Sequence, residues 1–374
     1  MKHDIPIRLE GHIIHLSQIK GLESVSQWQA YASLPTYAQE VINFCHQWLS
    51  GINIFFQQTS GSTGQPKQIE ITREQMTASA DMTAQALGLQ AGDQALLCLS
   101  AAYIAGKMML VRAMETGMAL WAVSPSSQPL AHVREVIDFM AVVPLQMKSL
   151  LDSSDERIFH QLNQMKAIII GGAPVSPKLE EEIECKLSCP VYSTYGMTET
   201  VSHVALRRLN GKSKSDLYQI LPGVEAQRDH RGCLMLRGAV TQHQWLTTND
   251  VVEMRDGQYF RWKGRADHVI NSGGVKIHTE ELEKKLEEGM QFLGSQRPYF
   301  VAGLEDEKLG QKVCLFVEGS PASPAQLQKL QLWWQERLSA YERPKQVFFT
   351  PRFAYTPTGK ILREESVQFI ASGQ

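Results

Sequence analysis

The sequence predicts a layered α/β domain followed by a smaller α+β unit. Between residues 52 and 196, short apolar runs that fit buried strands alternate with segments of helical spacing, a pattern typical of layered α/β folds. From about residue 220 the chain changes to short strands joined by turns, and a charged helix follows at 279–288. A chain of 374 residues is also too long for one hydrophobic core, so we expect two or three compact units.

The individual elements follow from local patterns. Aromatic and aliphatic residues at three- and four-residue spacing predict one or two helices within 24–50. The apolar run 52–58 predicts a strand, and residues 71–89 predict a helix with Thr72 as its N-cap. Further buried strands are predicted at 94–100, 119–123, 139–144, 167–170 and 189–196. We place a boundary near 264–268, where strand turns into glycine-rich loop, which divides the chain into 1–264 and 265–374.

Composition excludes several classes of protein. A hydrophobic fraction of 43% with 20% charged residues is typical of a soluble globular protein, and a formal charge of −2 does not favour nucleic-acid binding. No apolar run is long enough to cross a membrane, and the N-terminus does not resemble a secretory signal, so we expect a cytoplasmic protein. The six cysteines lack the spacing of a zinc site or a disulfide scaffold, and buried reduced thiols are expected.

The loop TSGSTGQPK at 59–67 is the strongest single motif. Its two glycines permit tight turns, and its hydroxyls and lysine can donate hydrogen bonds to phosphate oxygens. It is not a Walker loop, because Pro66 precedes the lysine and Gln68 follows it. A flexible linker is the alternative, but linkers rarely lie between an apolar strand and a capped helix. The candidate phosphate-binding residues are Thr59, Ser60, Gly61, Ser62, Thr63, Gly64 and Lys67.

Two further motifs, YGMTET at 195–200 and PTGK at 357–360, occur in the same chain. Together the three motifs resemble the adenylate-forming superfamily, which includes acyl-CoA synthetases, luciferases and peptide-synthetase adenylation domains. The resemblance runs from about residue 52 to 364 and also includes GGAP (171–174), TTND (247–250), GRADHVINSGGVKIHTEELE (264–283) and AYERPK (340–345). It implies ATP-dependent activation of a carboxylic acid as acyl-AMP, transfer of the acyl group to a thiol, and a small mobile C-terminal domain. Because the phosphate loop begins near residue 59, the first subdomain is expected to be reduced.

The resemblance also implies a role for each matching residue in the nucleotide site. Ser60, Thr63 and Lys67 would hold the β- and γ-phosphates of ATP. The adenine would lie beside Tyr195 and the 171–174 loop. The other residues assigned to the nucleotide by this match are Gly172, Ala173, Pro174, Gly196 and Met197.

Catalytic and hinge residues are implied in the same way. Thr198 would contact the α-phosphate, and Glu199 would bind Mg²⁺, a hard cation that prefers oxygen ligands. Asp250 and Arg265 would bind the ribose, although Asn249 replaces the glycine of the family's TGD motif. Lys360 would be the catalytic lysine, since an ammonium there stabilises the negative charge of the transition state. Asp267 would be the hinge of the mobile domain.

A longer segment of the sequence gives an indication of which acid is the substrate. YGMTETVSHVALRRLNG at 195–211 and the short N-terminal part resemble a shortened group of bacterial o-succinylbenzoate-CoA ligases of menaquinone biosynthesis. A second carboxylate on the acid requires a cation or several donors in the pocket. Candidate substrate-binding residues are Tyr103, Lys107, His203 and Arg207, the last together with Arg208. Lys107 could instead extend its ammonium to water, and the two arginines could form a solvated face.

The implied partners are therefore a small carboxylic acid, ATP with Mg²⁺, and coenzyme A as co-substrate. Two alternatives stay open at this point. One is a stand-alone enzyme that adenylates an aryl or amino acid and loads a carrier-protein thiol. The other is a nucleotide-binding relative without catalysis, against which the intact Lys360 and Glu199 argue. The sequence does not give the oligomeric state.

Overall fold

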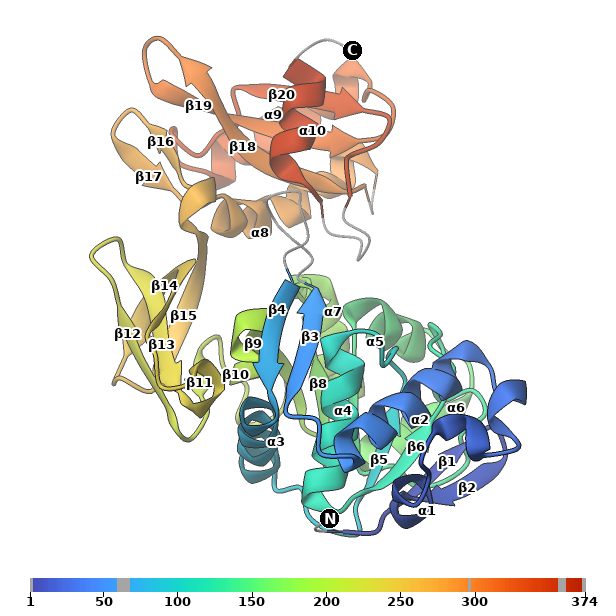
Figure 1. Cartoon of the computed structure of the whole chain (residues 1–374). Coiled ribbons are helices and arrows are strands. Elements are labelled where there is room, and N and C mark those ends of the chain that lie inside the picture. Colours follow the sequence, from blue (N-terminus) through green and yellow to red (C-terminus); the bar gives the residue numbers. More distant parts are fainter. Residues whose placement is uncertain (1–2, 59–67, 295–296, 356–360, 372–374) are drawn as a thin grey trace.

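The computed structural model describes residues 3–58, 68–294, 297–355 and 361–371. Figure 1 shows a large N-terminal part and a smaller C-terminal part, joined at the end of the antiparallel strands β14 and β15. The large part is built on a thirteen-stranded sheet in the order β12-β13-β14-β15-β11-β10-β9-β8-β7-β5-β6-β1-β2.

The middle of this sheet is parallel and the flanks are antiparallel. The parallel strands are β1 (Pro6–Leu9), β5 (Gln94–Leu97), β6 (Ala119–Ala122), β7 (Phe139–Val142), β8 (Ala167–Ile170) and β9 (Val191–Gly196). The remaining strands are β2 (His12–His15), β10 (His203–Arg208), β11 (Tyr218–Ile220), β12 (Val224–Arg228), β13 (Cys233–Gly238), β14 (Leu246–Arg255) and β15 (Tyr259–Arg265).

Helices cover both faces of the parallel strands. Successive strand residues point to opposite faces, so Leu97 packs in one hydrophobic core and Leu96 in the other. This explains why the strand sequences are apolar throughout rather than alternating. The first core receives α2 (Thr36–Leu49), α3 (Arg73–Leu87) and α4 (Ile104–Thr116), with α1 (Leu16–Lys20) near the sheet edge. The second receives α5 (Pro144–Leu151), α6 (Glu156–Gln164) and α7 (Pro177–Lys186).

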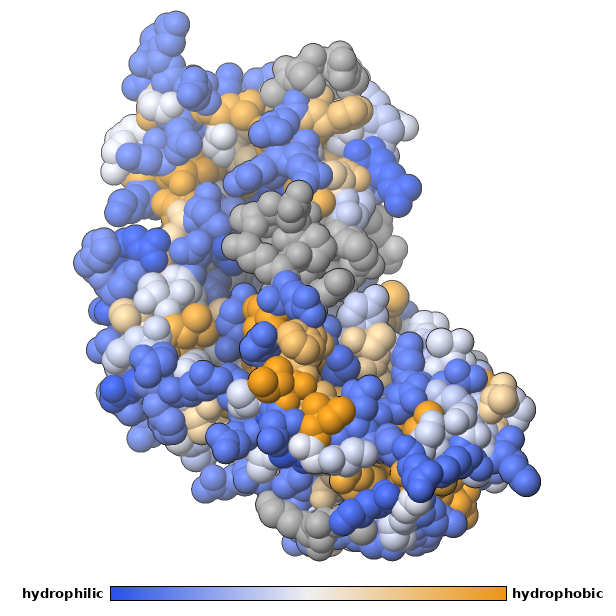
Figure 2. Space-filling view, in the orientation of Figure 1, coloured by the Kyte–Doolittle hydropathy of each residue, from blue (hydrophilic) through white to orange (hydrophobic). Residues whose placement is uncertain are grey.

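A separate hairpin carries the ends of the predicted phosphate loop. Strands β3 (Ile54–Gln58) and β4 (Gln68–Thr72) pair antiparallel. Thr72 then caps α3 as predicted, because its hydroxyl accepts a hydrogen bond from the backbone N–H of Gln75. The outer face of β3 exposes Ile54 and Phe56, and hydrophobic surface is visible in this region in Figure 2.

The C-terminal part has its own sheet and cores. Its strands are β16 (Ile270–Ser272), β17 (Val275–Ile277), β18 (Tyr299–Asp306), β19 (Gly310–Glu318) and β20 (Gln346–Thr350). Its helices are α8 (Thr279–Met290), α9 (Pro324–Arg337) and α10 (Arg363–Ala371). Glu287 of α8 lies at the first turn of α7. Burial raises the pKa of Glu287, although a hydrogen bond from the backbone of Lys178 acts in the other direction.

The layered α/β class is confirmed, and the predicted strands from 52 to 196 are all present within one to three residues. Residues 24–50 hold one α-helix, α2, within the predicted one or two. Before it, two short 3₁₀ turns form at Val25–Gln27 and Tyr31–Ser33, and Pro35 precedes α2. Five cysteines are buried, and Cys185 of α7 is exposed. No helix in the described ranges combines the length and apolarity that a bilayer span needs.

Candidate functional site at the carboxyl ends of the parallel strands

The predicted site segments follow neighbouring parallel strands. Tyr103 and Lys107 come after β5, the loop 171–174 follows β8, and residues 195–199 end and follow β9. Since β5, β7, β8 and β9 are parallel, their carboxyl ends lie along one edge of the sheet. Ligands of open α/β sheets bind outside such ends.

Two glycines permit close approach of the backbone at this edge. A Cβ on Gly171 would lie 2.5 Å from Thr194 Oγ1 on β9. Gly172 has φ of +82°, which favours glycine, and Ala173 and Pro174 follow it on the surface. A Cβ on Gly196 would lie 2.5 Å from His203 Cα and still closer to the Ser202 carbonyl oxygen. The two loops therefore need glycine for steric reasons.

The segment after Gly196 contains a strained turn. Thr198–Thr200 form a 3₁₀ turn, and Val201 then has φ of +67° and ψ of −58°. The Ser202 backbone N–H donates to the Thr200 carbonyl at 2.7 Å, which closes a three-residue γ-turn around Val201. Positive φ at a β-branched residue costs about 1 to 3 kcal/mol and is concentrated at functional sites.

Packing and hydrogen bonds hold this turn in place. Val201 is buried, and the Thr200 hydroxyl bonds to the carbonyls of Met197 and Ser202 at 3.0 and 2.8 Å. Thr198 is partly exposed and Glu199 is exposed. A cavity of about 210 Å³ is lined by Glu199 together with Glu70, Gln75, Thr241, Gln242, Gln244, Trp245 and Leu246.

Asp250 joins the turn region to the antiparallel strands. Its Oδ2 accepts a hydrogen bond of 2.6 Å from the Tyr195 hydroxyl, and its Oδ1 accepts one of 3.0 Å from Trp262 Nε1. Burial and the neighbouring Asp250 raise the pKa of Tyr195, so the phenol stays a donor. Each carboxylate oxygen keeps acceptor capacity that could take a ribose hydroxyl. Asn249 does not prevent Asp250 from reaching the end of β9.

Arg265 and Asp267 are bonded to each other. Arg265 lies opposite Asp250 across β14 and β15. Its guanidinium donates to both carboxylate oxygens of Asp267, at 3.0 and 2.7 Å. In this arrangement the predicted ribose contact of Arg265 competes with the Asp267 pair.

The candidate substrate-binding residues differ in their exposure and in the partners that they already have. Tyr103 is exposed. The Lys107 ammonium donates to Gln57 Oε1 at 3.0 Å, and burial lowers its pKa although Glu40 acts in the other direction. Arg207 forms a bidentate ion pair with Glu180, so its charge is already neutralised.

Within the described ranges, the hydrogen bonds of the other two candidates go to neutral groups. Arg208 donates to the side chain and carbonyl of Asn210 and to the Tyr192 hydroxyl. His203 is buried, with 5% of its surface exposed, and its Nε2 lies 3.1 Å from Thr83 Oγ1. The structure therefore places His203 in a buried polar network with Thr83, and its contact with the substrate stays a prediction.

Some predicted residues lie outside the described ranges. These are Thr59, Ser60, Gly61, Ser62, Thr63, Gly64 and Lys67 of the phosphate loop, and the catalytic candidate Lys360. Within the described ranges, no group of three or more His, Cys, Asp or Glu side chains is arranged as a metal cluster. The Mg²⁺ ion that the family implies would be held by Glu199 and by phosphate oxygens, which needs only one or two carboxylates.

Sequence reasoning missed one residue beside this site. Arg112 of α4 is only 3% exposed, and its Nη2 donates to Ser202 Oγ at 2.9 Å. In MMLVRAM the sequence shows a single arginine within an apolar helical run, which was the available signal. Lys107, five residues earlier in the same helix, was predicted instead as the substrate-binding cation.

The chain is similar to several known proteins. A family model described as "AMP-binding enzyme" matches residues 46–227. A solved acyl-CoA synthetase (AMP-forming)/AMP-acid ligase II-like protein from Dyadobacter fermentans is 42% identical, with a TM-score of 0.60, over 91% of this chain and 98% of that one.

Two further comparisons concern one enzyme activity. A 2-succinylbenzoate–CoA ligase from Geobacillus sp. (strain WCH70) is 27% identical over 84% of this chain and 69% of its own length. The o-succinylbenzoate CoA synthetase from Bacillus subtilis, solved with the acyl-adenylate OSB-AMP, is 25% identical with a TM-score of 0.69, over 83% of this chain and 68% of that one.

Proposed function

The chain belongs to the AMP-binding enzyme family of adenylate-forming acid–CoA ligases, and from this we propose that it converts o-succinylbenzoate to o-succinylbenzoyl-CoA. ATP would activate one carboxylate as the acyl-AMP with release of pyrophosphate, and the CoA thiol would then displace AMP. The observation that carries the proposal is the meeting of Tyr195, Thr198, Glu199 and Asp250 at the carboxyl ends of β8 and β9.

The described residues suit a bound nucleotide. We propose that adenine lies against Tyr195 and the Gly172–Ala173 backbone, with the ribose hydroxyls on Asp250. Thr198 would donate to the α-phosphate, and Glu199 would hold Mg²⁺, which neutralises phosphate charge. The 59–67 loop would bind the β- and γ-phosphates, and Lys360 would be the catalytic lysine.

The acid is supported by the two 2-succinylbenzoate enzymes at 25–27% identity. A cytoplasmic location and a division at 264/265 into a nucleotide-binding and a mobile part belong to the same proposal. The hydrophobic cores are consistent with such a division, since those of the C-terminal part begin at Ile270 and those of the large part end at Phe260.

One assay tests the reaction and the acceptor together. Purified protein is incubated with ATP, Mg²⁺, a panel of aromatic and aliphatic acids, and either CoA or a phosphopantetheinylated carrier protein. We expect acid-dependent pyrophosphate release and a mass-spectrometric signal for o-succinylbenzoyl-CoA. A loaded carrier protein without acyl-CoA would instead support the carrier-loading alternative, and no pyrophosphate with any acid would support a non-catalytic protein.

A further inference from the structure

Arg112 is a buried cation whose hydrogen-bond partners among the described residues are all neutral. Its Nε donates to Thr83 Oγ1 at 3.2 Å and its Nη2 to Ser202 Oγ at 2.9 Å. Its Nη1 is bonded only to the sulfur of Met109, at 3.8 Å, among the contacts of the described residues. The residues outside the described ranges include no aspartate or glutamate. Burial lowers the pKa of Arg112 to about 10.

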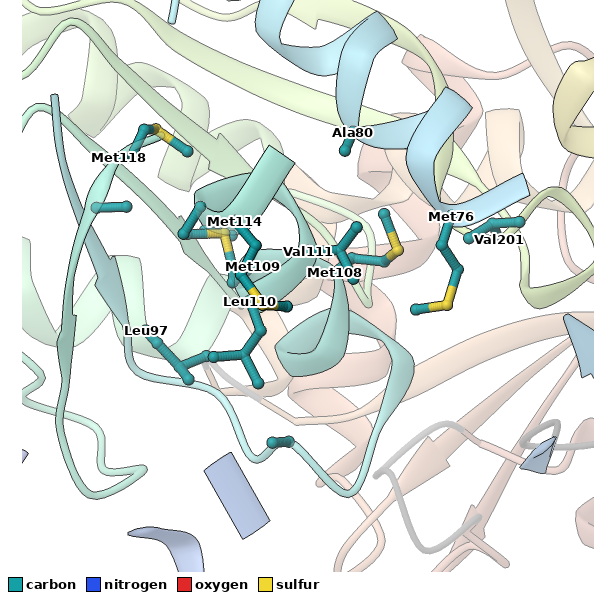
Figure 3. Packing of buried hydrophobic residues seen from close by; sticks show 14 of the residues in the cluster. Met76, Ala80, Leu97, Met108, Met109, Leu110, Val111, Met114, Met118 and Val201 are labelled. Atoms are coloured by element: carbon teal, nitrogen blue, oxygen red, sulfur yellow. The ribbon is translucent and has the colours of Figure 1, made fainter. Parts of the chain in front are cut away.

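In the described part of the chain, the groups around Arg112 do not supply a negative charge. Burial and the nearby guanidinium hold the pKa of His203 well below its usual value, so this ring is neutral. The Thr83 hydroxyl donates to the Ser79 carbonyl at 2.9 Å, and Ser79 and Ser202 hydroxyls are 2.6 Å apart. Around them the core is apolar, and Figure 3 shows Met76 and Ala80 of α3 with Met108 and Met109 of α4 in it.

An uncompensated charge in such surroundings is unfavourable, because proteins normally pair buried ions. A guanidinium also offers five donors in a planar fork that matches a carboxylate. Three of these donors are engaged by the contacts above, one of them with a sulfur. The site thus has both the charge and the donors for an anion.

One partner of the Arg112 guanidinium lies close in sequence to the predicted magnesium-binding residue Glu199. This partner, Ser202, is partly exposed and comes three residues after Glu199. The strained γ-turn at Val201 fixes Ser202 in this position. By contrast, Arg207 is paired with Glu180, and Lys107 is bonded to Gln57 with Glu40 nearby.

We propose that Arg112, together with Ser202, Ser79 and Thr83, forms the anion subsite that binds the second carboxylate of a dicarboxylic acid substrate. The inference deepens the proposed ligase function and rests on it. It assigns selectivity for dicarboxylates to one residue deep in α4 rather than to the exposed Tyr103 or to the Arg207–Arg208 pair.

The test compares two acids that differ by one carboxylate, 2-succinylbenzoate and 4-oxo-4-phenylbutanoate. Pyrophosphate release gives kcat/KM for each acid with wild type, Arg112→Met, Arg112→Lys and the exposed control Arg134→Met. We expect Arg112→Met to lower the preference for the dicarboxylate by about 30-fold or more, the usual effect of removing a buried charge partner. The value for the monocarboxylate should change little, and Arg112→Lys should retain part of the preference.

Thermal unfolding provides a second readout that does not depend on turnover. Without ligand, Arg112→Met should unfold at the same or a higher temperature, since it replaces an uncompensated charge by an apolar side chain of similar length. In wild type, 2-succinylbenzoate should raise the unfolding temperature more than 4-oxo-4-phenylbutanoate does, and this difference should vanish in Arg112→Met.

Several outcomes would overturn the proposal. Equal losses with both acids, together with a lower unfolding temperature, would give Arg112 a structural role. An unchanged preference in Arg112→Met, with loss in Lys107→Met, would assign the carboxylate to Lys107. If wild type prefers monocarboxylates, the subsite is wrong while the ligase proposal stands. If wild type activates no acid, the ligase proposal fails, and the absence of a dicarboxylate-dependent thermal shift would reject the subsite as well.

Discussion

Gly196, the last residue of β9, shows how closely single residues are constrained at this site. Any side chain there would meet the backbone of Ser202 and His203. We expect Gly196→Ala to lower the free energy of unfolding by about 1 to 3 kcal/mol, because backbone atoms cannot move aside as a flexible side chain can. Urea denaturation measures the change. The control is Gly21→Ala, whose Cβ would make only contacts of 3.6 Å or more, so a similar loss there would contradict the steric argument.

At the same scale, Lys360→Ala is expected to abolish acyl-adenylate formation while folding and ATP binding persist. Its charge acts mainly in the transition state, and loss of such a preorganised contact lowers the rate by about a hundredfold or more. Pyrophosphate release, thermal unfolding and ATP titration are the measurements. Lys329→Ala, an exposed lysine of α9, is the matched control. Near-normal pyrophosphate release by folded Lys360→Ala protein would reject the assignment.

Residue-level predictions succeeded where sequence spacing itself carries the information. Thr72 was recognisable as an N-cap because a hydroxyl preceded a helical pattern. The burial of Arg112 was not predictable from the sequence. Whether an arginine in an apolar helix reaches water or the core depends on the residues of α3 and β10 that pack beside it. The burial of His203 was not predicted for the same reason, since its position next to the predicted magnesium motif does not show that it points into the core.

At the level of elements, helix α8 links the predicted hinge region to the segment after Lys360. Arg363 begins α10 three residues after Lys360 and donates to Glu283 Oε2 at 2.8 Å and to Thr279 Oγ1 at 3.2 Å. Glu280, one turn earlier, accepts from the Arg265 backbone and contacts His268 Nδ1 at 2.5 Å. The first two turns of α8 therefore contact residues from both ends of the C-terminal part.

Glu283 makes this contact sensitive to pH. Burial raises its pKa from 4.5 to about 7, although Arg363 and the Val301 amide act in the other direction. Because the folded-state pKa is the higher one, its contribution to stability is complete below pH 4.5 and is lost as the pH rises through 7. We expect a loss of about 1 to 3 kcal/mol between pH 5 and 8, measured by denaturant unfolding.

Glu283→Gln should remove this pH dependence, whereas Glu288→Gln, an exposed change on the same helix, should preserve it. A pH dependence that survives Glu283→Gln would mean that another group is responsible. The elements themselves were well predicted from periodicity, but this coupling was not, since it joins residues 80 positions apart through side chains.

For the whole molecule, the proposed two-step reaction requires the C-terminal part to move. Lys360 must enter the site for adenylation, and a thiol must later reach the same acyl carbon, so one arrangement cannot serve both steps. Asp267 lies in the 3₁₀ turn Ala266–His268 between the two parts. A few backbone dihedrals at such a turn can absorb a domain rotation.

Asp267→Pro fixes φ and disfavours the helical conformation of Ala266, so it should trap one arrangement. If the adenylating state is trapped, we expect acyl-AMP synthesis to persist and acyl-CoA formation to fall by about tenfold or more. Pyrophosphate exchange and acyl-CoA are measured on one preparation. Asp267→Asn weakens the ion pair with Arg265 without restricting the backbone, and it separates the two effects. Equal losses in both half-reactions would argue against a hinge.

The architecture of the whole chain was predictable to the level of fold class. The layered architecture followed from alternating strand and helix patterns, and the change of sequence pattern near residue 220 indicated the later short strands joined by turns. The continuity of β10–β15 with the parallel strands in one thirteen-stranded sheet was not predicted, because strand pairing between distant segments leaves little trace in local sequence.

Because Cys185 is exposed, the native chain can be labelled with a fluorescent dye at this residue. The other five thiols are buried, and burial raises the pKa of Cys45, Cys98 and Cys189 to about 12, which suppresses the reactive thiolate. A maleimide dye should therefore label the unmutated protein once, on α7. The other end of α7 contacts Glu287 of α8, so the emission of this dye should change when the C-terminal part leaves α7. Stopped-flow fluorescence could then follow domain movement in real time, with mixing of ATP, acid and CoA in turn.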